Sequence, residues 1–411
     1  MIGRRRTRLT REGWYYLLVL AFVVTGALLR EINLLIIMSG LLIGPLLLNW
    51  RMVVGALRPL KVSRRAAEVV SAEEAFSVDL VVNSRPSWFA RLALGSWAPG
   101  SWGVTIDDVI RRLGPGLPRN EVRTGVFFWR IGRGETARLA YRGRLMKRGR
   151  YRLGPLTLST RFPLGLVRRT IHVDAVQDVL VLPRQGRLTP AWQTLCRRIL
   201  HSDRGRRIQT SVMDGDFHSL RDWRPGDARR QIHWRTTARR RTPTVRRFEL
   251  PHNADVALLL DICQTTAAAG SEDDETVEHA IRFAATVLGD LCRQNSGRVI
   301  LGVAGQTANV FRGSASAGLL RECLEHLATL EAGSGAALHS MVSDVLTNLR
   351  RDARVVVVST RSQRDMGEEA VGLLQDWVAA GGMPTSPTLV LSAAQGELDE
   401  FFVCDRGEVH A

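Results

Sequence analysis

The chain has 411 residues, of which 45% are hydrophobic, and its mean hydropathy lies near zero. This length is too great for one small domain and predicts two or three globular units. The formal net charge of +17 is unevenly distributed, because residues 1–250 hold 46 Lys and Arg against 18 Asp and Glu, whereas residues 251–411 hold 11 against 22. The asymmetry predicts a basic half that faces anions and an acidic half built differently.

Five cysteines are scattered through the sequence without a C-x-x-C pair: Cys196, Cys263, Cys292, Cys323 and Cys404. An odd number at irregular spacing argues against a disulfide framework or a zinc knuckle and suits a reducing compartment. The sequence also lacks a G-x-S-x-G elbow, a Walker loop and an H-E-x-x-H motif. We therefore expect no catalytic residue and no enzymatic activity.

Two apolar runs near the N-terminus, residues 14–29 and 32–50, are separated by only two charged residues. A helix needs ~20 residues to cross the hydrocarbon core, so the sequence predicts a transmembrane helical hairpin over residues 1–50. A cleaved signal peptide is disfavoured, because the second run follows at once and no A-x-A site intervenes. Basic residues flank both outer ends, and Trp14 and Trp50 stand where aromatic rings favour the interface. This pattern predicts a multi-pass plasma-membrane protein whose termini and soluble domains are cytoplasmic.

Residues 51–185 change to short alternating stretches such as FSVDLVV (76–82) and GVFFWRI (125–131), separated by Gly and Pro turns. Period-two runs bounded by turn residues predict an antiparallel β-sandwich or barrel. The sequence GRGETA (132–137) approaches a phosphate-binding G-x-G-x-x-G loop, but Ala137 takes the last glycine position and no helix follows. We expect a hairpin turn there, and a structural or interaction role for this domain.

From residue 251 onward, buried-strand runs alternate with helical apolar spacing. The strand runs are ADVALLLD (254–261), RVILGVAG (298–305), TANVFRG (307–313), RVVVVST (354–360) and TLVLS (388–392), with a further helix expected through Leu374 and Trp377. Strands that alternate with helices predict a parallel sheet covered on both faces, whose ligands bind beyond the carboxyl ends of the strands. Polar residues follow two of these strands: Asp261, Cys263, Thr265, Ser359 and Thr360.

This order of elements resembles a von Willebrand factor A-like domain, an α/β fold of the Rossmann type. The metal-binding version of that domain carries D-x-S-x-S after its first strand, where this chain has Asp261, Cys263 and Thr265. Magnesium prefers hard oxygen ligands in octahedral geometry, for which one carboxylate, one hydroxyl and a thiol are a poor set. We expect a degenerate site without magnesium or another cofactor. A metal-dependent A-domain ligand binder is the alternative.

Residues 220–249 hold ten arginines and only three acids, Asp222, Asp227 and Glu249. A turn at residues 225–227, the apolar anchors Ile232, Trp234 and Ala238 and a terminal strand run indicate a folded segment, since a disordered arm would lack the anchors. We expect Asp227 to act as an N-cap that accepts from backbone N–H groups two or three residues on. We expect the arginines to pair with these acids or to form contacts between the basic and acidic halves of the chain. Binding of nucleic acid or anionic lipid is the alternative that the charge allows.

The same stretch resembles the signature of the bacterial "domain of unknown function 58" family. The matching positions are Arg221, Asp222, Trp223, Gly226, Asp227, Arg230, Ile232, Trp234, Ala238, Arg239, Val245, Phe248 and Glu249. Residues 148–166 resemble a second motif of that family, with Phe162 where an Asp usually stands. We expect four parts: the transmembrane hairpin (1–50), the β-sandwich domain (51–185), a basic connector with the signature (186–250) and the A-like α/β domain (251–411).

Members of the family are often encoded beside MoxR-type AAA+ ATPases and other A-domain proteins. The resemblance therefore implies a non-enzymatic adaptor, anchored in a bacterial inner membrane, that works with such an ATPase or A-domain protein in the maturation of protein complexes. It implies no catalytic role for the signature residues, which we expect to be structural or to bind a partner. Nucleic acid is the less favoured partner, and the sequence identifies no small-molecule substrate.

Overall fold

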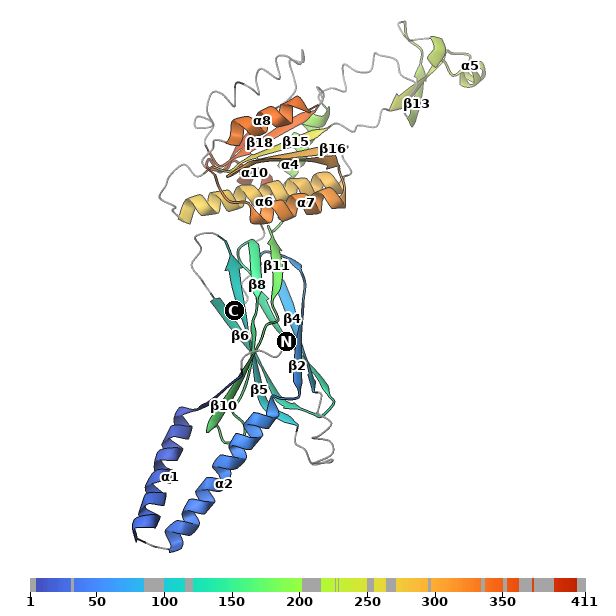
Figure 1. Ribbon diagram of the computed structural model, residues 1–411. Helices are drawn as coiled ribbons and strands as arrows, with labels where there is room; N and C mark the ends of the chain where they lie inside the picture. The colour runs from blue at the N-terminus through green and yellow to red at the C-terminus, as the bar shows by residue number, and fades with distance from the viewer. Residues whose placement is uncertain are drawn as a thin grey trace. The chain divides into compact units, whose positions relative to one another are not determined.

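The computed structural model describes residues 5–30, 33–84, 100–114, 121–201, 216–225, 227, 229–249, 255–263, 271–294, 297–333, 337–349, 353–361, 372 and 388–404. The chain divides into two compact units, Met1–Leu182 and Pro183–Ala411. The first unit holds the N-terminal helices and a β-rich body, and the second holds the α/β elements (Figure 1).

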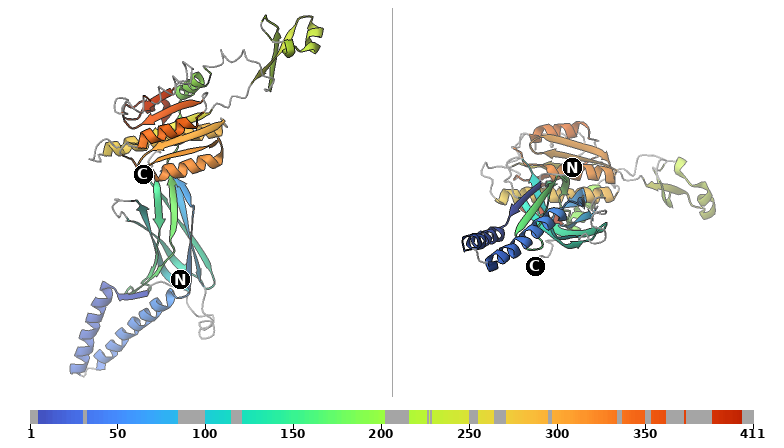
Figure 2. Two further views of the ribbon diagram at one scale, coloured as in Figure 1. Left: turned by 45° about the horizontal axis from the view of Figure 1, so that its top comes forward. Right: turned by 60° about the horizontal axis from the view of Figure 1, so that its bottom comes forward.

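Two long apolar helices belong to the first unit, α1 (Arg11–Arg30) and α2 (Asn33–Ala56). They lie side by side in Figures 1 and 2, and the Tyr16 hydroxyl donates to the Leu42 carbonyl at 2.8 Å. Many of their large apolar side chains are exposed, Phe22 and Leu41 among them. Such surfaces suit lipid better than water, and both helices are long and apolar enough to cross a membrane.

Both outer ends of this helical hairpin are tied to the same sheet. Before α1, strand β1 (Arg5–Leu9) pairs antiparallel with β10 (Val167–Val173). After α2, Ser101 Oγ donates to the Ala56 carbonyl at 2.5 Å, and Arg169 Nη1 donates to the Val54 carbonyl at 3.0 Å. Side chains of the β-rich body thus satisfy carbonyls that the helix end leaves without intrahelical partners. The two ends of the hairpin consequently lie on the same side of it.

Two sheets make up the β-rich body. Among the described strands, eight form one sheet in the order β1–β10–β9–β5–β8–β11–β3, with β6 paired to β5, and β2, β4 and β7 form the other. The bounds are β2 (Leu60–Ala66), β3 (Val69–Ser71), β4 (Ala75–Ser84), β5 (Ser101–Leu113), β6 (Glu121–Ile131), β7 (Thr136–Arg144), β8 (Gly149–Leu153), β9 (Leu156–Thr160) and β11 (Gln177–Leu182). Buried side chains of both sheets share one core, Leu80 from one with Ile106 and Leu158 from the other. Strands β4 and β6 lie where the alternating stretches at residues 76–82 and 125–131 predicted strands.

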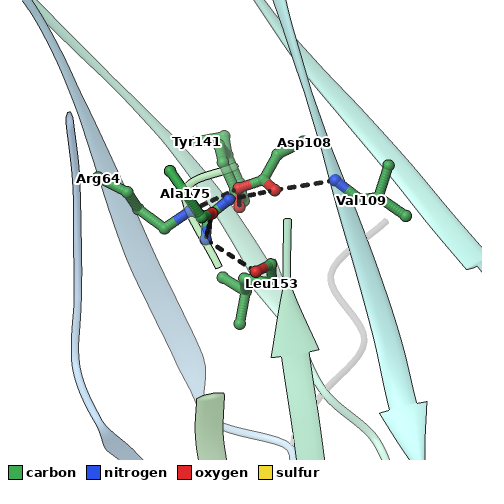
Figure 3. Close-up of polar contacts among 6 residues, drawn as sticks. All are labelled: Arg64, Asp108, Val109, Tyr141, Leu153 and Ala175. Carbon is green, nitrogen blue, oxygen red and sulfur yellow. Dashed lines mark hydrogen bonds and ion pairs between the residues drawn. The ribbon is translucent and has the colours of Figure 1, made fainter. Parts of the chain in front are cut away.

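A buried polar network joins the two sheets inside that core (Figure 3). Arg64 of β2 donates to Asp108 of β5 from Nε at 2.9 Å and from Nη2 at 2.6 Å, and Nη1 donates to the carbonyls of Leu153 and Ala175 at 3.0 Å each. The Tyr141 hydroxyl of β7 donates to Asp108 at 2.7 Å. Because both carboxylate oxygens and all three guanidinium nitrogens have partners, the buried charges are compensated. The network is a structural link and leaves little capacity for a ligand.

The second unit is built on a sheet of the order β17–β16–β15–β18–β19. Its strands are β15 (Val256–Asp261), β16 (Arg298–Ala304), β17 (Ala308–Ser314), β18 (Arg354–Ser359) and β19 (Thr388–Ser392). Helix α8 (Ala337–Thr347) covers one face, and α6 (Ser271–Arg293) with α7 (Ala317–Thr329) covers the other (Figure 1). The mixed α/β body predicted from residue 251 onward is present.

One strand of this sheet departs from the expected parallel arrangement. Strands β15, β16, β18 and β19 are parallel, but β17 is antiparallel to β16. Residues 305–307 alone connect β16 to β17, and a parallel pair needs a crossover of about a dozen residues or more. The expectation of a wholly parallel sheet was therefore wrong at this edge. The helix expected through Leu374 and Trp377 lies outside the described residues.

The segment 186–250, expected as one connector, begins with elements that pack on the α/β sheet's own helices. Strand β12 (Arg187–Leu188) pairs with β20 (Phe402–Val403), and α4 (Pro190–His201) follows it. Trp192 of α4 is buried edge-on against Phe283 of α6 and Phe401 of α10 (Leu398–Phe401). An indole of this size needs an apolar surface, and α6 provides it.

Candidate functional site

The arginine-rich segment folds as a small unit over residues 216–249, which we name the basic segment. Strands β13 (Asp216–Asp222) and β14 (Thr244–Glu249) pair antiparallel, and the short helices η3 (Arg229–Gln231) and α5 (Trp234–Arg240) lie between them in the chain. Ile232 forms a β-bridge to Val245, which is 1% exposed. The backbone N–H of His233 donates to the Thr244 carbonyl at 2.8 Å. Ile232 thus acts as the predicted apolar anchor, but the same prediction was wrong for Trp234 and Ala238, whose side chains are exposed.

The turn after β13 is held by Arg221 and Asp227. Two guanidinium nitrogens of Arg221 donate to the two carboxylate oxygens at 2.6 Å each, and the Arg224 backbone N–H donates to Asp227 Oδ2 at 2.9 Å. The Arg221 hydrogen bonds, followed by that of the Arg224 amide, hold the pKa of Asp227 below its ordinary value. The indole N–H of Trp223 donates to the Asp227 carbonyl at 3.3 Å. Asp227 therefore organises the residues that precede it.

The described acceptor contacts of Asp227 all point backward along the chain, so its expected N-cap role stays a prediction. His233 is the residue that caps α5. Its Nδ1 accepts from the Thr236 backbone N–H at 3.3 Å and lies 2.7 Å from the Thr236 hydroxyl. Histidine is an uncommon N-cap residue, so the sequence pattern indicated Asp227 instead.

Most other arginines that the structure describes in the basic segment lack the ion pairs that we expected. Apart from Arg224, whose charge acts on Asp227, those with described side chains are exposed and have no acidic partner within the described part of the chain: Arg229, Arg235, Arg239, Arg240, Arg241 and Arg246. Two indoles accompany them, Trp223 at 36% and Trp234 at 68% exposed. Asp222 and Ala238 are also exposed. Gly226 and the side chains of Arg230, Phe248 and Glu249 lie outside the described residues.

A second group of predicted residues meets at the carboxyl ends of β15 and β18. Asp261 and Ser359 are register partners at the ends of these strands, and both are fully buried. Asp261 Oδ2 accepts from Ser359 Oγ at 2.8 Å and from Arg361 Nε at 3.0 Å, and Arg361 Nη2 lies 2.9 Å from the same oxygen. Burial raises the pKa of Asp261, and the charge of Arg361 opposes that rise. Arg361 thus supplies the positive charge beside Asp261.

Cys263 and Thr360 are joined at the same strand ends. The Thr360 hydroxyl accepts from the Cys263 backbone N–H at 3.0 Å and donates to the Cys263 carbonyl at 2.8 Å. Burial raises the pKa of the Cys263 thiol, which keeps it protonated. Thr265 lies outside the described residues. The structure therefore brings together Asp261, Cys263, Ser359 and Thr360 as predicted, and it adds Arg361, which the sequence argument had not singled out.

These described donors do not fit a magnesium ion. One oxygen of Asp261 is bound to a guanidinium and a hydroxyl, and the Thr360 hydroxyl is committed to backbone groups. Asp261 Oδ1 is buried without a hydrogen-bond partner among the described residues, which leaves one hard ligand beside a soft thiol. Within the described ranges, no group of three or more His, Cys, Asp or Glu side chains is arranged to hold a metal.

Residues 219–374 match the family described as "Protein of unknown function DUF58", a range that includes most of the basic segment and the strand ends around Asp261. No curated protein matches the chain. Among solved structures, the CARDB domain of a Pyrococcus furiosus protein is 15% identical over 30% of this chain and 87% of its own length, with a TM-score of 0.16. A superoxide reductase (neelaredoxin) from Ignicoccus hospitalis is 17% identical over 29% of this chain and 79% of its own, with a TM-score of 0.18. At such TM-scores neither likeness bears on fold or function.

Proposed function

Because the chain belongs to the DUF58 family through residues 219–374, we propose that it is a non-enzymatic, membrane-anchored adaptor that binds a partner protein through the basic segment. The partner that the sequence resemblance implies is a MoxR-type AAA+ ATPase or another A-domain protein. In this proposal the adaptor assists such an ATPase in the maturation of protein complexes.

The observation that carries the proposal is the set of exposed arginines on the basic segment together with Trp223 and Trp234. Arginine and tryptophan are enriched in protein–protein interfaces, where they supply most of the binding energy. A basic surface also steers encounter with an acidic partner surface. The Arg221–Asp227 pair and the His233 cap hold the segment in one shape, which reduces the ordering that binding must overcome.

The rest of the chain takes supporting roles in this proposal. Helices α1 and α2 form the transmembrane hairpin, with both termini and the soluble units on the cytoplasmic side of a bacterial inner membrane. The two sheets of the first unit form a β-sandwich, and the second unit is a degenerate von Willebrand factor A-like domain. The pairing of Asp261 with Arg361 supports a binding role over a metal-dependent one, because the carboxylate already has a cation.

Affinity capture of the full-length protein from detergent extracts tests the proposal. We expect wild-type protein to recover an AAA+ ATPase, and the double variant Arg239→Glu/Arg240→Glu to recover less than a tenth as much. The matched control is Arg239→Lys/Arg240→Lys, which keeps the charge on two exposed helical positions and retains much of the capture. Absence of an ATPase from wild-type samples, both with and without ATP, would overturn the proposal.

The same arginines favour a second candidate, a binder of nucleic acid or anionic lipid. Phosphate neutralisation by Arg gives affinity that falls steeply with salt. Retention of the full-length protein on DNA or on anionic vesicles, measured across a salt series, separates the two. Salt-dependent retention that the Glu variant loses, together with no ATPase capture, would establish this alternative in place of the adaptor.

A further inference from the structure

Exposed aromatic side chains gather where the β-rich body meets α2. Phe127 and Trp129 of β6 are 54% and 64% exposed, and Leu164, in the loop 161–166, is 50% exposed. Trp102 of β5 and Phe162 of the loop are partly exposed and complete the group. We name these five residues the aromatic patch.

The patch is a connected set of rings held in one arrangement. Trp102 stacks on Phe162 with ring centroids 5.8 Å apart, and Trp129 meets the two rings edge-on at 6.2 and 6.3 Å. Phe127 lies 6.4 Å from Trp129. On β6 the side chain of Phe128 enters the core, so the alternation of a strand turns Phe127 and Trp129 outward.

A glycine makes the close approach of the loop possible. Gly103 has a φ of +58°, a region that residues with a side chain rarely adopt. A Cβ added there would lie 2.9 Å from the Cβ of Phe162. A side chain at residue 103 would force Phe162 to shift, so the glycine permits the present stacking of Phe162 over β5.

The loop that carries Phe162 and Leu164 also touches both apolar helices. The backbone N–H of Leu164 donates to Asn49 Oδ1 of α2 at 3.4 Å, and the Thr10 hydroxyl, just before α1, donates to the Gly165 carbonyl at 2.7 Å. Val53 of α2 packs against Leu166 in a small buried cluster. The patch is thus continuous with the two helices at their ends nearest the sheet.

The level of this contact along α2 matches the expected membrane surface. From Asn33 to Trp50 the helix rises about 27 Å at ~1.5 Å per residue, close to the ~30 Å of a hydrocarbon core. Asn49 is the neighbour of Trp50, so Leu164 lies at the level where the apolar run ends. Aromatic rings favour this depth, since one side meets acyl chains and the other meets headgroups and water.

Basic side chains next to the patch complete the pattern of an interfacial surface. The guanidinium of Arg130 lies over the Trp102 ring at 5.1 Å, and Arg161 is exposed directly before Phe162. Arginines at this level can reach headgroup phosphates while their stems cover apolar surface. We propose that the aromatic patch inserts into the headgroup region of the bilayer beside α2, as a membrane contact additional to the helices. This inference rests on the proposed anchoring by α1 and α2.

Quenching of tryptophan emission by brominated lipid tests the insertion. The full-length protein is reconstituted in vesicles of phosphatidylcholine and phosphatidylglycerol, with and without bromine near the headgroup end of the acyl chains. The measured quantity is the fraction of tryptophan emission that bromine removes. We expect Trp129→Phe to lower this fraction, because it removes an emitter within reach of the lipid. Trp234→Phe, which removes an exposed tryptophan of the basic segment, should leave the fraction unchanged or raise it.

The helix variants Trp14→Phe and Trp50→Phe separate failure of the patch from failure of the anchor. If they lower the quenched fraction and Trp129→Phe does not, the helices are inserted and the inference is overturned. If none of the three variants lowers it, the anchoring itself fails. Emission of Trp129 that is shielded from aqueous iodide but insensitive to bromine would show that a protein surface covers the patch, which also overturns the inference.

Discussion

At the carboxyl ends of β15 and β18, the arrangement of single residues determines which chemistry the second unit can support. Asp261 has no exposure to solvent, and its ion-pair partner Arg361 has a side chain that is 13% exposed. A buried pair of this kind adds little stability over an apolar pair, but loss of one partner leaves a buried charge uncompensated. Replacing either residue alone should therefore destabilise the protein more than replacing both.

We predict that Asp261→Ala and Arg361→Met each lower the free energy of unfolding by about 3–5 kcal/mol, whereas the double variant loses much less. Denaturant unfolding of the full-length protein in detergent measures the three values, and their non-additivity is the interaction energy. Magnesium serves as the control ligand. Stabilisation of wild type by magnesium that Asp261→Ala abolishes would contradict the role assigned to Arg361.

The network in the first unit allows a matched comparison of two buried tyrosines. Burial and the nearby Asp108 carboxylate raise the pKa of Tyr141, whose hydroxyl donates to that charged group. Tyr151 donates to the neutral Lys147 carbonyl at 2.8 Å and has nearly the same exposure. Hydrogen bonds to charged groups contribute about 1.5–3 kcal/mol, and neutral ones about 0.5–1.5 kcal/mol.

We therefore predict that Tyr141→Phe destabilises the first unit more than Tyr151→Phe does. Thermal unfolding of the two full-length variants under identical conditions gives the comparison. Equal losses would mean that the Tyr141 hydroxyl is not needed to satisfy Asp108, despite its place in the network.

Sequence reasoning located Asp261 and Ser359 because strand ends are visible in a pattern of apolar runs. It missed Arg361 because the contact depends on the register of β15 against β18, across residues 100 positions apart in the chain. The same limit applies to Arg64 and Asp108. The alternating sequence around each residue predicts a strand, but it does not show that the two side chains form an ion pair. Local pattern specifies an element, whereas pairing is decided by the sheet.

At the scale of elements, the turn of the basic segment depends on the charge of one carboxylate. Because Arg221 and the Arg224 amide lower the pKa of Asp227, the folded turn favours the ionised form. That contribution is fully present above the ordinary carboxyl pKa, and it is lost as the pH falls through the lowered one. Because the pair is partly exposed to solvent, its contribution to stability is small.

We predict that the Arg224 amide loses protection from hydrogen exchange as the pH falls through the lowered pKa of Asp227, after correction for the intrinsic pH dependence of exchange. In Asp227→Asn the protection should be weak at every pH. Deuterium uptake of the peptide that contains Arg224 provides the measurement. Protection that persists in acid would show that the Arg221 contact is not what holds the turn.

Elements were predicted most accurately where period and length agree. The two apolar runs, the alternating stretches at residues 76–82 and 125–131 and the buried run ending at Asp261 were found from pattern. Strand β1 was not, because RRTRL is a charged sequence with no apolar alternation over most of its length. It becomes a strand by pairing with β10, a tertiary effect that outweighs its composition.

At the scale of the whole molecule, β1 precedes helices α1 and α2 in the sequence and forms one edge of the eight-stranded sheet. Without it, β10 would present unpaired backbone groups, which are a template for aggregation. We predict that replacing residues 5–9 with Gly and Ser leaves membrane insertion intact but shifts the detergent-solubilised protein to aggregates in size-exclusion chromatography. Replacement by a different run of strand-forming residues should restore the monodisperse peak. Unchanged elution of the Gly-Ser variant would contradict a role for β1 in closing the sheet.

During translation, β1 is made long before the strand with which it pairs. Arg5 leaves the ribosome first, yet its register partner Ile171 is made only after both helices and most of the β-rich body. Residues 5–9 therefore stay unpaired with β10 until the hairpin and most of the β-rich body have been made. When β10 arrives and captures them, reversal of the hairpin would require breaking a strand out of a finished sheet. Under the proposed membrane anchoring, insertion would set the topology of the hairpin first, and pairing of β1 with β10 would then hold it.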